Sequence, residues 1–227
     1  MPEQLNFPLT SRPALERDDF FVSPSNAIAV ALIDAPHSWP AGRLILTGPP
    51  GCGKTHLTHV WAAQTGGQIV HSSALAGADI PTLAAHPVAL EDADRGAGDP
   101  AFETALFHLH NLIAANGHAL LVTARTPPAR WGVTLPDLAS RLGAIQHAAL
   151  EPPDDDLLGA VIMKLLADRQ LRPAPDVVPY LVRRIDRSFE AALAIIDALD
   201  DAALTQNRPI TRALAAQVLD KLGAAPA

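Results

Sequence analysis

Hydrophobic and polar positions follow two patterns along roughly the first 150 residues. Short apolar runs are typical of strands buried on both faces, and longer segments with apolar residues three or four positions apart are typical of helices. The expected strands cover residues 43–47, 68–71, 88–90, 118–123 and 144–150. The expected helices cover residues 27–34, 54–64, 101–115 and 135–142. Strands that alternate with helices predict a five-stranded parallel sheet with right-handed crossovers.

The pattern changes after Pro152 and Pro153, where the aspartates 154–156 follow at once. Beyond that point only helical periodicity is found. The expected helices cover residues 154–169, 175–185, 187–204 and 211–222. We therefore predict an α/β domain at residues 11–151 and a small all-α domain at residues 152–227. Residues 1–10 contain two prolines, which oppose helix formation, and we expect a flexible tail there.

One motif lies between the first expected strand and the helix that follows it. Residues 48–55 fit the P-loop pattern GxxxxGK[ST], whose backbone N–H groups and helix start point at phosphate oxygens. We expect Lys54 to reach the β- and γ-phosphates and Thr55 to offer its hydroxyl to Mg²⁺. The predicted nucleotide-binding residues here are Gly48, Pro49, Pro50, Gly51, Cys52, Gly53, Lys54, Thr55 and His56. Cys52, the single cysteine, is expected to fill space rather than to act as a nucleophile.

Further polar residues fall at the same edge of the predicted sheet. Glu91 and Asp92 follow the third strand, where an acidic pair can hold Mg²⁺ and orient a water. We assign Glu91 to the metal and Asp92 to the water. Thr123 ends the fourth strand at the carboxyl edge, where ligands bind in open α/β sheets. A solvated acidic loop and an ordinary strand-end threonine remain the alternatives.

Composition and charge narrow the classes of function. A net charge of −7 opposes a surface built to cover nucleic acid, because phosphate contacts need clustered lysine and arginine. No secretory signal and no run of transmembrane length is found, so we expect a cytoplasmic protein without membrane association.

His108 and His110 lie two apart on a predicted helix and face different ways. We expect them to be surface or interface residues rather than metal ligands.

Taken together, the motifs resemble a known family over nearly the whole chain. Residues 48–55 match its Walker A motif, and Glu91-Asp92 lies at its Walker B position. Further similar segments are residues 20–26 (adenine pocket), 123–128 (sensor one), 138–142 (the box with the arginine finger) and 187–193 (sensor two). On these residues the chain resembles the DnaA clade of AAA+ ATPases, and most closely the Hda (HdaA-like) regulatory inactivators of DnaA.

The resemblance implies roles for residues that would otherwise be ordinary surface positions. Arg187 would fold back onto the β- and γ-phosphates from a helical lid domain of the same chain. Arg141 would enter the nucleotide site of a neighbouring subunit, and such an arginine is worth roughly 10³–10⁵ in rate in GTPase systems. Phe21, Val22 and Asn26 would line the adenine pocket. The implied cofactors are ADP or ATP with Mg²⁺.

The tail carries a second partner motif. Residues 4–9 read Gln-Leu-Asn-Phe-Pro-Leu and resemble the peptide that binds the β subunit of DNA polymerase, the sliding clamp. The amide of Gln4 would find polar partners, while Leu5, Phe7 and Leu9 would enter an apolar groove. A disordered start with stray hydrophobic residues is the alternative. Because no basic helix-turn-helix domain follows the lid, we expect no direct sequence-specific DNA binding.

These expectations combine into one function. The chain would be a negative regulator of replication initiation that binds the clamp and stimulates ATP hydrolysis by DnaA in trans; a homodimer stays open. Glu91 stands where the family usually has aspartate, and Mg²⁺ demands near-ideal octahedral geometry, so we expect little turnover by the chain itself. The alternatives are a DNA-associated initiator or helicase-loader-type ATPase, and a small-molecule kinase.

Overall fold

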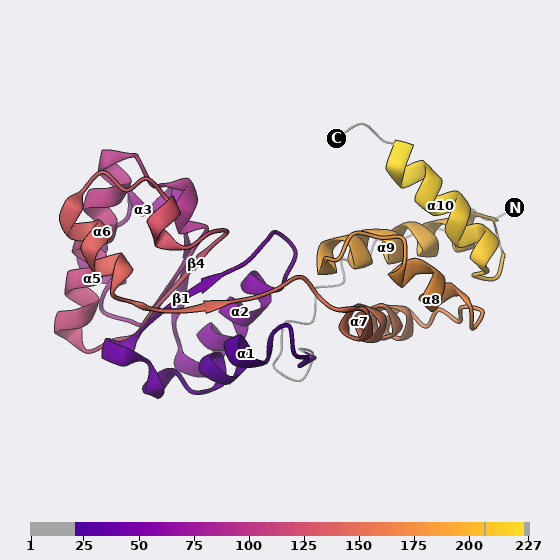
Figure 1. Ribbon diagram of the computed structural model, residues 1–227, viewed down its shortest axis with the longest axis horizontal. Coiled ribbons are helices and arrows are strands. Elements are labelled where there is room, and N and C mark those ends of the chain that lie inside the picture. The colour runs from indigo at the N-terminus through magenta and orange to yellow at the C-terminus, as the bar shows by residue number, and fades with distance from the viewer. Residues whose placement is uncertain (1–20, 207, 225–227) are drawn as a thin grey trace, which may run out of the picture.

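The computed structural model describes residues 21–206 and 208–224 of the 227-residue chain (Figure 1). An α/β core lies on the left of Figure 1, and a group of helices from the C-terminal part of the chain lies on the right. The segment that follows β5 (Gln146–Ala149) leads from the core to these helices in this view. None of the helices in the described ranges is long and apolar enough to span a lipid bilayer.

The core is built on one sheet, whose five described strands are all parallel. They are β1 (Arg43–Thr47), β2 (Gln68–His71), β3 (Val88–Glu91), β4 (Leu120–Ala124) and β5 (Gln146–Ala149). Their order across the sheet is β2-β3-β4-β1-β5. The predicted parallel sheet is confirmed, and its order brings the carboxyl ends of β1, β3 and β4 to one edge.

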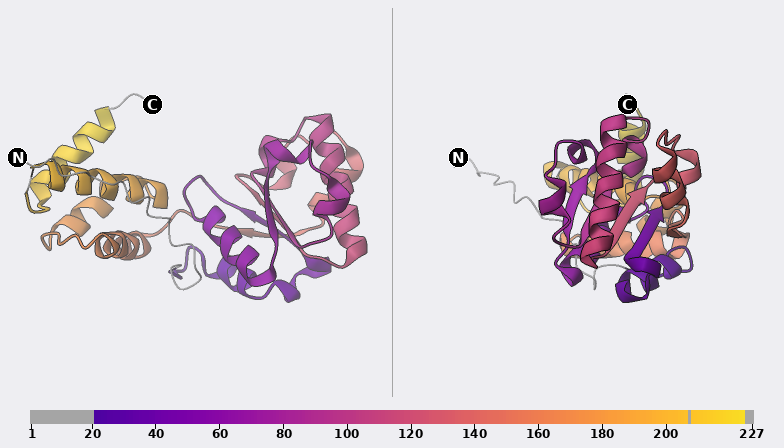
Figure 2. Two further views of the ribbon diagram at one scale, coloured as in Figure 1. Left: turned by 180° about the vertical axis from the view of Figure 1, so that it is seen from behind. Right: turned by 90° about the vertical axis from the view of Figure 1, so that its left-hand side faces the viewer.

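Helices cover both faces of the sheet, as Figure 2 shows from two further sides. Along β1, Leu44 and Leu46 belong to one buried cluster and Ile45 to the other, because successive strand residues point to opposite faces. The first cluster packs against α1 (Ala27–Asp34) and α2 (Lys54–Thr65). The second packs against α3 (Ser72–Leu75), α4 (Ile80–Leu83), α5 (Pro100–Asn116) and α6 (Pro136–Gly143).

Two of these helices were not predicted. α3 and α4 have four residues each, which is too short for a 3.6-residue repeat to show in the hydrophobic pattern. Both start at a capping side chain: His71 accepts the N–H of Ser73, and Asp79 accepts the N–H of Thr82. Such caps satisfy N–H groups that have no partner inside the helix. Local capping therefore allows helices that periodicity alone does not reveal.

The C-terminal helices have a core of their own. They are α7 (Asp155–Asp168), α8 (Val177–Val182), α9 (Phe189–Gln206) and α10 (Arg212–Ala224). α7 starts where the carboxylate of Asp154 accepts the N–H of Leu157 at 2.8 Å, as the predicted boundary requires. Ile162, Leu181 and Ile196, from three different helices, are completely buried in this second core. The predicted helical lid region is confirmed.

Candidate functional site

The P-loop joins β1 to α2 and shows why glycine is needed at Gly48 and Gly51. A Cβ atom on Gly48 would lie 2.5 Å from the carbonyl oxygen of Leu150, far inside van der Waals contact. Gly51 has a φ of +70°, which L side chains rarely adopt. The N–H of Gly48 donates to the carbonyl of Ala124 at 3.2 Å, so the loop begins beside the end of β4.

The side chain of Lys54 is folded into its own loop. Its ammonium group donates to the carbonyl oxygens of Gly48 at 2.7 Å and Pro49 at 2.8 Å, and the residue is 8% exposed. Thr55 and His56 follow in the first turn of α2. Burial raises the pKa of the Cys52 thiol, although the nearby charge of Lys54 acts in the opposite direction. Cys52 therefore packs as a neutral thiol within the loop.

The acidic pair and Thr123 meet beside this loop. The N–H of Asp92 donates to the hydroxyl of Thr123 at 3.2 Å, which joins the ends of β3 and β4. Asp92 has the left-handed backbone conformation, with φ +52°. Oε1 of Glu91 is buried and has no hydrogen-bond partner within the described part of the chain. An unpartnered carboxylate oxygen beside a P-loop is suited to bind a cation such as Mg²⁺.

Two partners of Asp92 were missed by the sequence analysis. Its carboxylate lies 3.6 Å from Nε2 of His71 and 3.4 Å from Nε of Arg95. His71 ends β2 and stands in register with Glu91 on β3. Only the order of the strands brings His71 to this place. No local motif in the sequence marks His71 as a partner of Asp92. Arg95, by contrast, is only three residues after Asp92 and could have been considered as its partner.

The segment assigned to the adenine pocket is shaped by Asn26, which is 3% exposed. Its side-chain oxygen accepts the N–H of Ser23 at 2.9 Å, and its nitrogen donates to the carbonyl of Phe21 at 2.9 Å. Asn26 therefore orders the turn with both ends of its amide. Phe21 and Val22 leave apolar surface exposed on the same segment.

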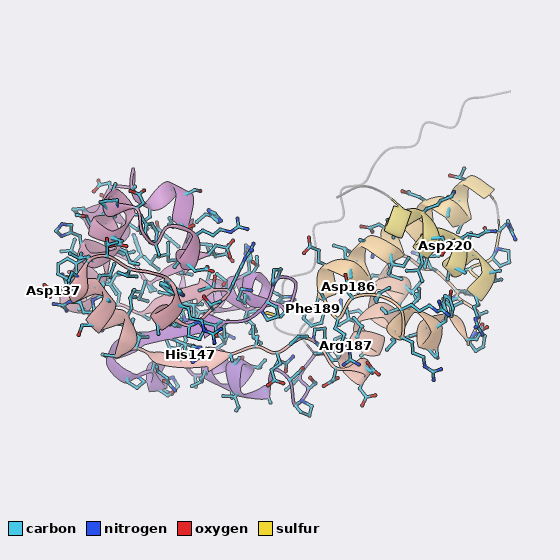
Figure 3. All side chains as sticks on the ribbon, turned by 45° about the horizontal axis from the view of Figure 1, so that its top comes forward. Asp137, His147, Asp186, Arg187, Phe189 and Asp220 are labelled. Carbon is cyan, nitrogen blue, oxygen red and sulfur yellow. The ribbon has the colours of Figure 1, made fainter. Side chains whose placement is uncertain are left out.

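The helical region contacts the P-loop directly through the start of α9. The N–H of Phe189 donates to the carbonyl of Gly51 at 2.7 Å, and a Cβ atom on Gly51 would lie 2.6 Å from the Cβ atom of Ser188. Figure 3 shows Arg187 and Phe189 at the junction between the two parts. The guanidinium of Arg187 pairs with Asp155 at 2.7 Å. Sequence reasoning found Arg187 but missed this partner and the contact of Ser188.

Arg141 is not brought together with the other predicted site residues. It is exposed near the end of α6, and its guanidinium carbon lies 5.1 Å from the ring centroid of Phe107 on α5. α6 lies at the end of the core away from the lid, where Asp137 marks it in Figure 3. The predicted clamp-binding residues Gln4, Leu5, Phe7 and Leu9 lie outside the described residues.

Comparison with protein families gives one match. Residues 159–219 match the family described as Hda, lid domain. The C-terminal helices are therefore similar to the lid domain of Hda. The matched segment runs from within α7 to within α10 and so includes Arg187 and the start of α9. The predicted resemblance to Hda proteins is confirmed.

Solved structures confirm the predicted fold over most of the chain. Domain III of the replication initiation protein DnaA from Thermotoga maritima has a TM-score of 0.77 and 18% identity, covering 92% of this chain and 97% of that one. AMPPCP-bound DnaA from Aquifex aeolicus has a TM-score of 0.68 and 17% identity, covering 80% and 63%. A RuvB variant from Thermotoga maritima has a TM-score of 0.68 and 19% identity, covering 87% and 68%. These likenesses establish the DnaA-like AAA+ fold.

Proposed function

We propose that this protein is a negative regulator of replication initiation that stimulates ATP hydrolysis by DnaA in trans. The observation that carries the proposal is the exposed Arg141 on α6, at the end of the core away from its own lid. A cation placed there is available to the nucleotide of a second molecule. The Hda-type lid supports DnaA as that molecule.

The P-loop is the proposed site for ADP or ATP. Phosphate oxygens would replace the carbonyls of Gly48 and Pro49 as partners of the Lys54 ammonium. Thr55 and Glu91 would hold Mg²⁺, which neutralises phosphate charge when bound, and the unpartnered Oε1 of Glu91 fits that task. The AMPPCP found in the Aquifex aeolicus DnaA supports an adenine nucleotide here.

Weak turnover by the chain itself is part of the proposal. Asp92, assigned to the attacking water, has its carboxylate beside His71 and Arg95. Both neighbours compete with a water for the carboxylate oxygens. The chain would therefore act chiefly on the nucleotide of its partner. Residues 4–9 would bring it to DnaA by binding the sliding clamp, since tethering raises the effective concentration at the replication site.

The decisive experiment is Arg141→Ala in an assay of DnaA-bound ATP hydrolysis with clamp-loaded DNA. We expect stimulated hydrolysis to fall by about 10²-fold or more, because arginines supplied in trans contribute roughly 10³–10⁵ in GTPase systems. Nucleotide binding and clamp binding should not change. The matched control is Arg172→Ala, which removes an exposed arginine from the lid. Normal stimulation by Arg141→Ala would rule out the assigned role.

Deletion of residues 1–9 tests the tether separately. We expect the shortened protein to lose retention on immobilised sliding clamp while it keeps its affinity for nucleotide. Stimulation of DnaA should then require a much higher protein concentration, because the local enrichment is lost. Unchanged retention on the clamp would exclude the tail from the mechanism without affecting the role of Arg141.

A further inference from the structure

A buried carboxylate joins α5 to the start of the helix that carries Arg141. Glu103 on α5 is 1% exposed. It accepts the N–H of Gly98 at 2.8 Å and the N–H of Leu135 at 2.8 Å. It also accepts the N–H of Thr134 at 3.0 Å and its hydroxyl at 2.7 Å. Because a buried charge is costly without partners, this set of donors ties the segment before α6 firmly to α5.

Glu103 holds the residues just before α6 without capping its first turn, because its donors Thr134 and Leu135 precede the helix. Leu135 is the N-cap residue of α6, and an apolar side chain cannot accept a hydrogen bond from the first turn. A carboxylate near a helix N-terminus is favoured by the helix dipole. Burial acts against the charge of Glu103, but the donors of Thr134, Gly98 and Leu135 prevail and lower its pKa to about 2. The group is therefore ionised at neutral pH.

The next turn of α5 supports the other end of α6. Phe107 lies four residues after Glu103, so the two side chains share one face of α5. The guanidinium carbon of Arg141 lies 5.1 Å from the centroid of the Phe107 ring, within the range of a cation–π contact. One face of α5 thus holds α6 at its start and supports the guanidinium near its end.

The charge of Arg141 is not neutralised at this place. No carboxylate in the described ranges forms an ion pair with it. Two basic side chains lie close enough to feel this charge. Burial and then the charge of Arg141 lower the pKa of Arg43. Burial, Arg43 and, more weakly, Arg141 lower the pKa of His110 to about 4. The ring of Phe107 supports the guanidinium without cancelling its charge, so it stays available for an anionic ligand.

We propose that Glu103 and Phe107 are positioning residues that present Arg141, oriented and uncompensated, to the nucleotide of another molecule. The proposal rests on the function proposed above. Holding the arginine in place reduces the side-chain entropy lost when its guanidinium engages the reacting phosphate, which for a long side chain is substantial. α5 and α6 therefore act as a support that sets the rate of stimulated hydrolysis without touching nucleotide.

Phe107→Leu is the sharpest test, because it keeps apolar bulk and removes the aromatic face. We expect the maximal rate of stimulated DnaA hydrolysis to fall about two- to fivefold, as a surface cation–π contact implies. The half-saturating protein concentration and the nucleotide affinity should not change. Phe107→Tyr keeps the aromatic ring and should give the maximal rate of the unmodified protein. The control is Thr104→Ala on the same helix, whose exposed hydroxyl donates only to the carbonyl of Pro100.

The anchor is tested by Thr134→Ala, because replacing Glu103 can unfold the core. This variant removes one hydroxyl donor and leaves the three N–H donors to Glu103 in place. We again expect a lower maximal rate at an unchanged half-saturating concentration. A rise in that concentration alone would indicate a contact with DnaA and would overturn the positioning role.

A physical readout separates this inference from the proposed function. The NMR signal of the Arg141 Nε–H group should carry a ring-current shift that disappears in Phe107→Leu and persists in Thr104→Ala. Absence of the shift in the unmodified protein would overturn the support by Phe107, whatever the assay shows. If Arg141→Ala abolishes stimulation while Phe107→Leu and Thr134→Ala stimulate fully, the positioning role is wrong and the proposed function stands.

Discussion

At the scale of single residues, the unexpected side chains are the buried polar ones of α5. We expected His110 to be a surface or interface residue, and it is instead buried within the fold, with 7% of its surface exposed. The reason is tertiary: the guanidinium of Arg43, at the start of β1, reaches the carbonyl of His110 at 3.1 Å and packs over this turn. Glu103 was likewise unremarkable in the sequence, because its donors on Thr134 and Leu135 lie 31 and 32 residues further along the chain.

Glu103→Gln is expected to destabilise the protein by about 1–3 kcal/mol at pH 7, the usual cost of leaving buried polar groups without a charged partner. The pKa of Glu103 is lowered from 4.5 to about 2 by folding, against the effect of burial. Its contribution is therefore present above pH 4.5 and is lost as the pH falls from there towards 2. Urea unfolding between pH 7 and pH 2 measures this difference. The variant should lose less stability over the acid range than the unmodified protein, and the exposed Glu151→Gln should behave normally.

At the scale of elements, the start of α9 connects the lid to the P-loop. The N–H of Phe189 donates to the carbonyl of Gly51 in the P-loop, and Arg187 is two residues before Phe189 in the sequence. In this structure the guanidinium of Arg187 pairs with Asp155 at the start of α7. A phosphate group would therefore compete with Asp155 for the same cation. The lid thus contains both the proposed phosphate ligand, Arg187, and its competitor, Asp155.

Asp155→Asn should raise the affinity for ADP by up to about fivefold. Both partners of this ion pair are more than half exposed, and such pairs contribute about 0–1 kcal/mol. Titration calorimetry with ADP measures the effect, and the neighbouring exposed Asp156→Asn is the matched control. An equal gain in both variants would point to general charge rather than release of Arg187. In the Arg187→Ala background the gain should vanish, since the two residues act through one contact.

At the scale of the whole molecule, two separately packed cores meet at the P-loop. The lid core and the two clusters of the α/β core consist of different residues. A ligand that contacts both parts stabilises the folded state of each through its binding energy. The proposed nucleotide is in that position, since the P-loop belongs to the core and Phe189 of the lid contacts it.

ADP with Mg²⁺ should therefore raise the thermal midpoint of the protein. Binding at a ligand concentration of 100 times Kd adds about 2.7 kcal/mol of stability. Thermal unfolding with increasing ADP measures the effect, and adenosine, which lacks phosphates, serves as the ligand control. Lys54→Ala should abolish most of the increase, because it removes the ammonium group at the centre of the loop. A full increase in that variant would mean that the nucleotide binds elsewhere.

Local features of the chain were predictable from the sequence. The strands, the P-loop at Gly48–Thr55 and the change to helices after Pro153 were all visible as short-range patterns. Their causes are local as well: side-chain periodicity reports burial, glycine permits tight turns, and aspartate caps helices. The resemblance to Hda proteins rested on the same short motifs, and the roles assigned to Arg141 and Arg187 remain predictions.

Which side chains contact each other was decided only by the tertiary structure. His71 lies beside Asp92 because β2 neighbours β3, and Glu103 meets Thr134 because α6 packs against α5. Such pairs join residues about 20 to 30 positions apart, where neither propensity nor periodicity carries information. A sequence pattern states which face of an element is buried, whereas the order of the elements determines what that face meets. The surroundings of each predicted site residue therefore became known only once the sheet and its helices were in place.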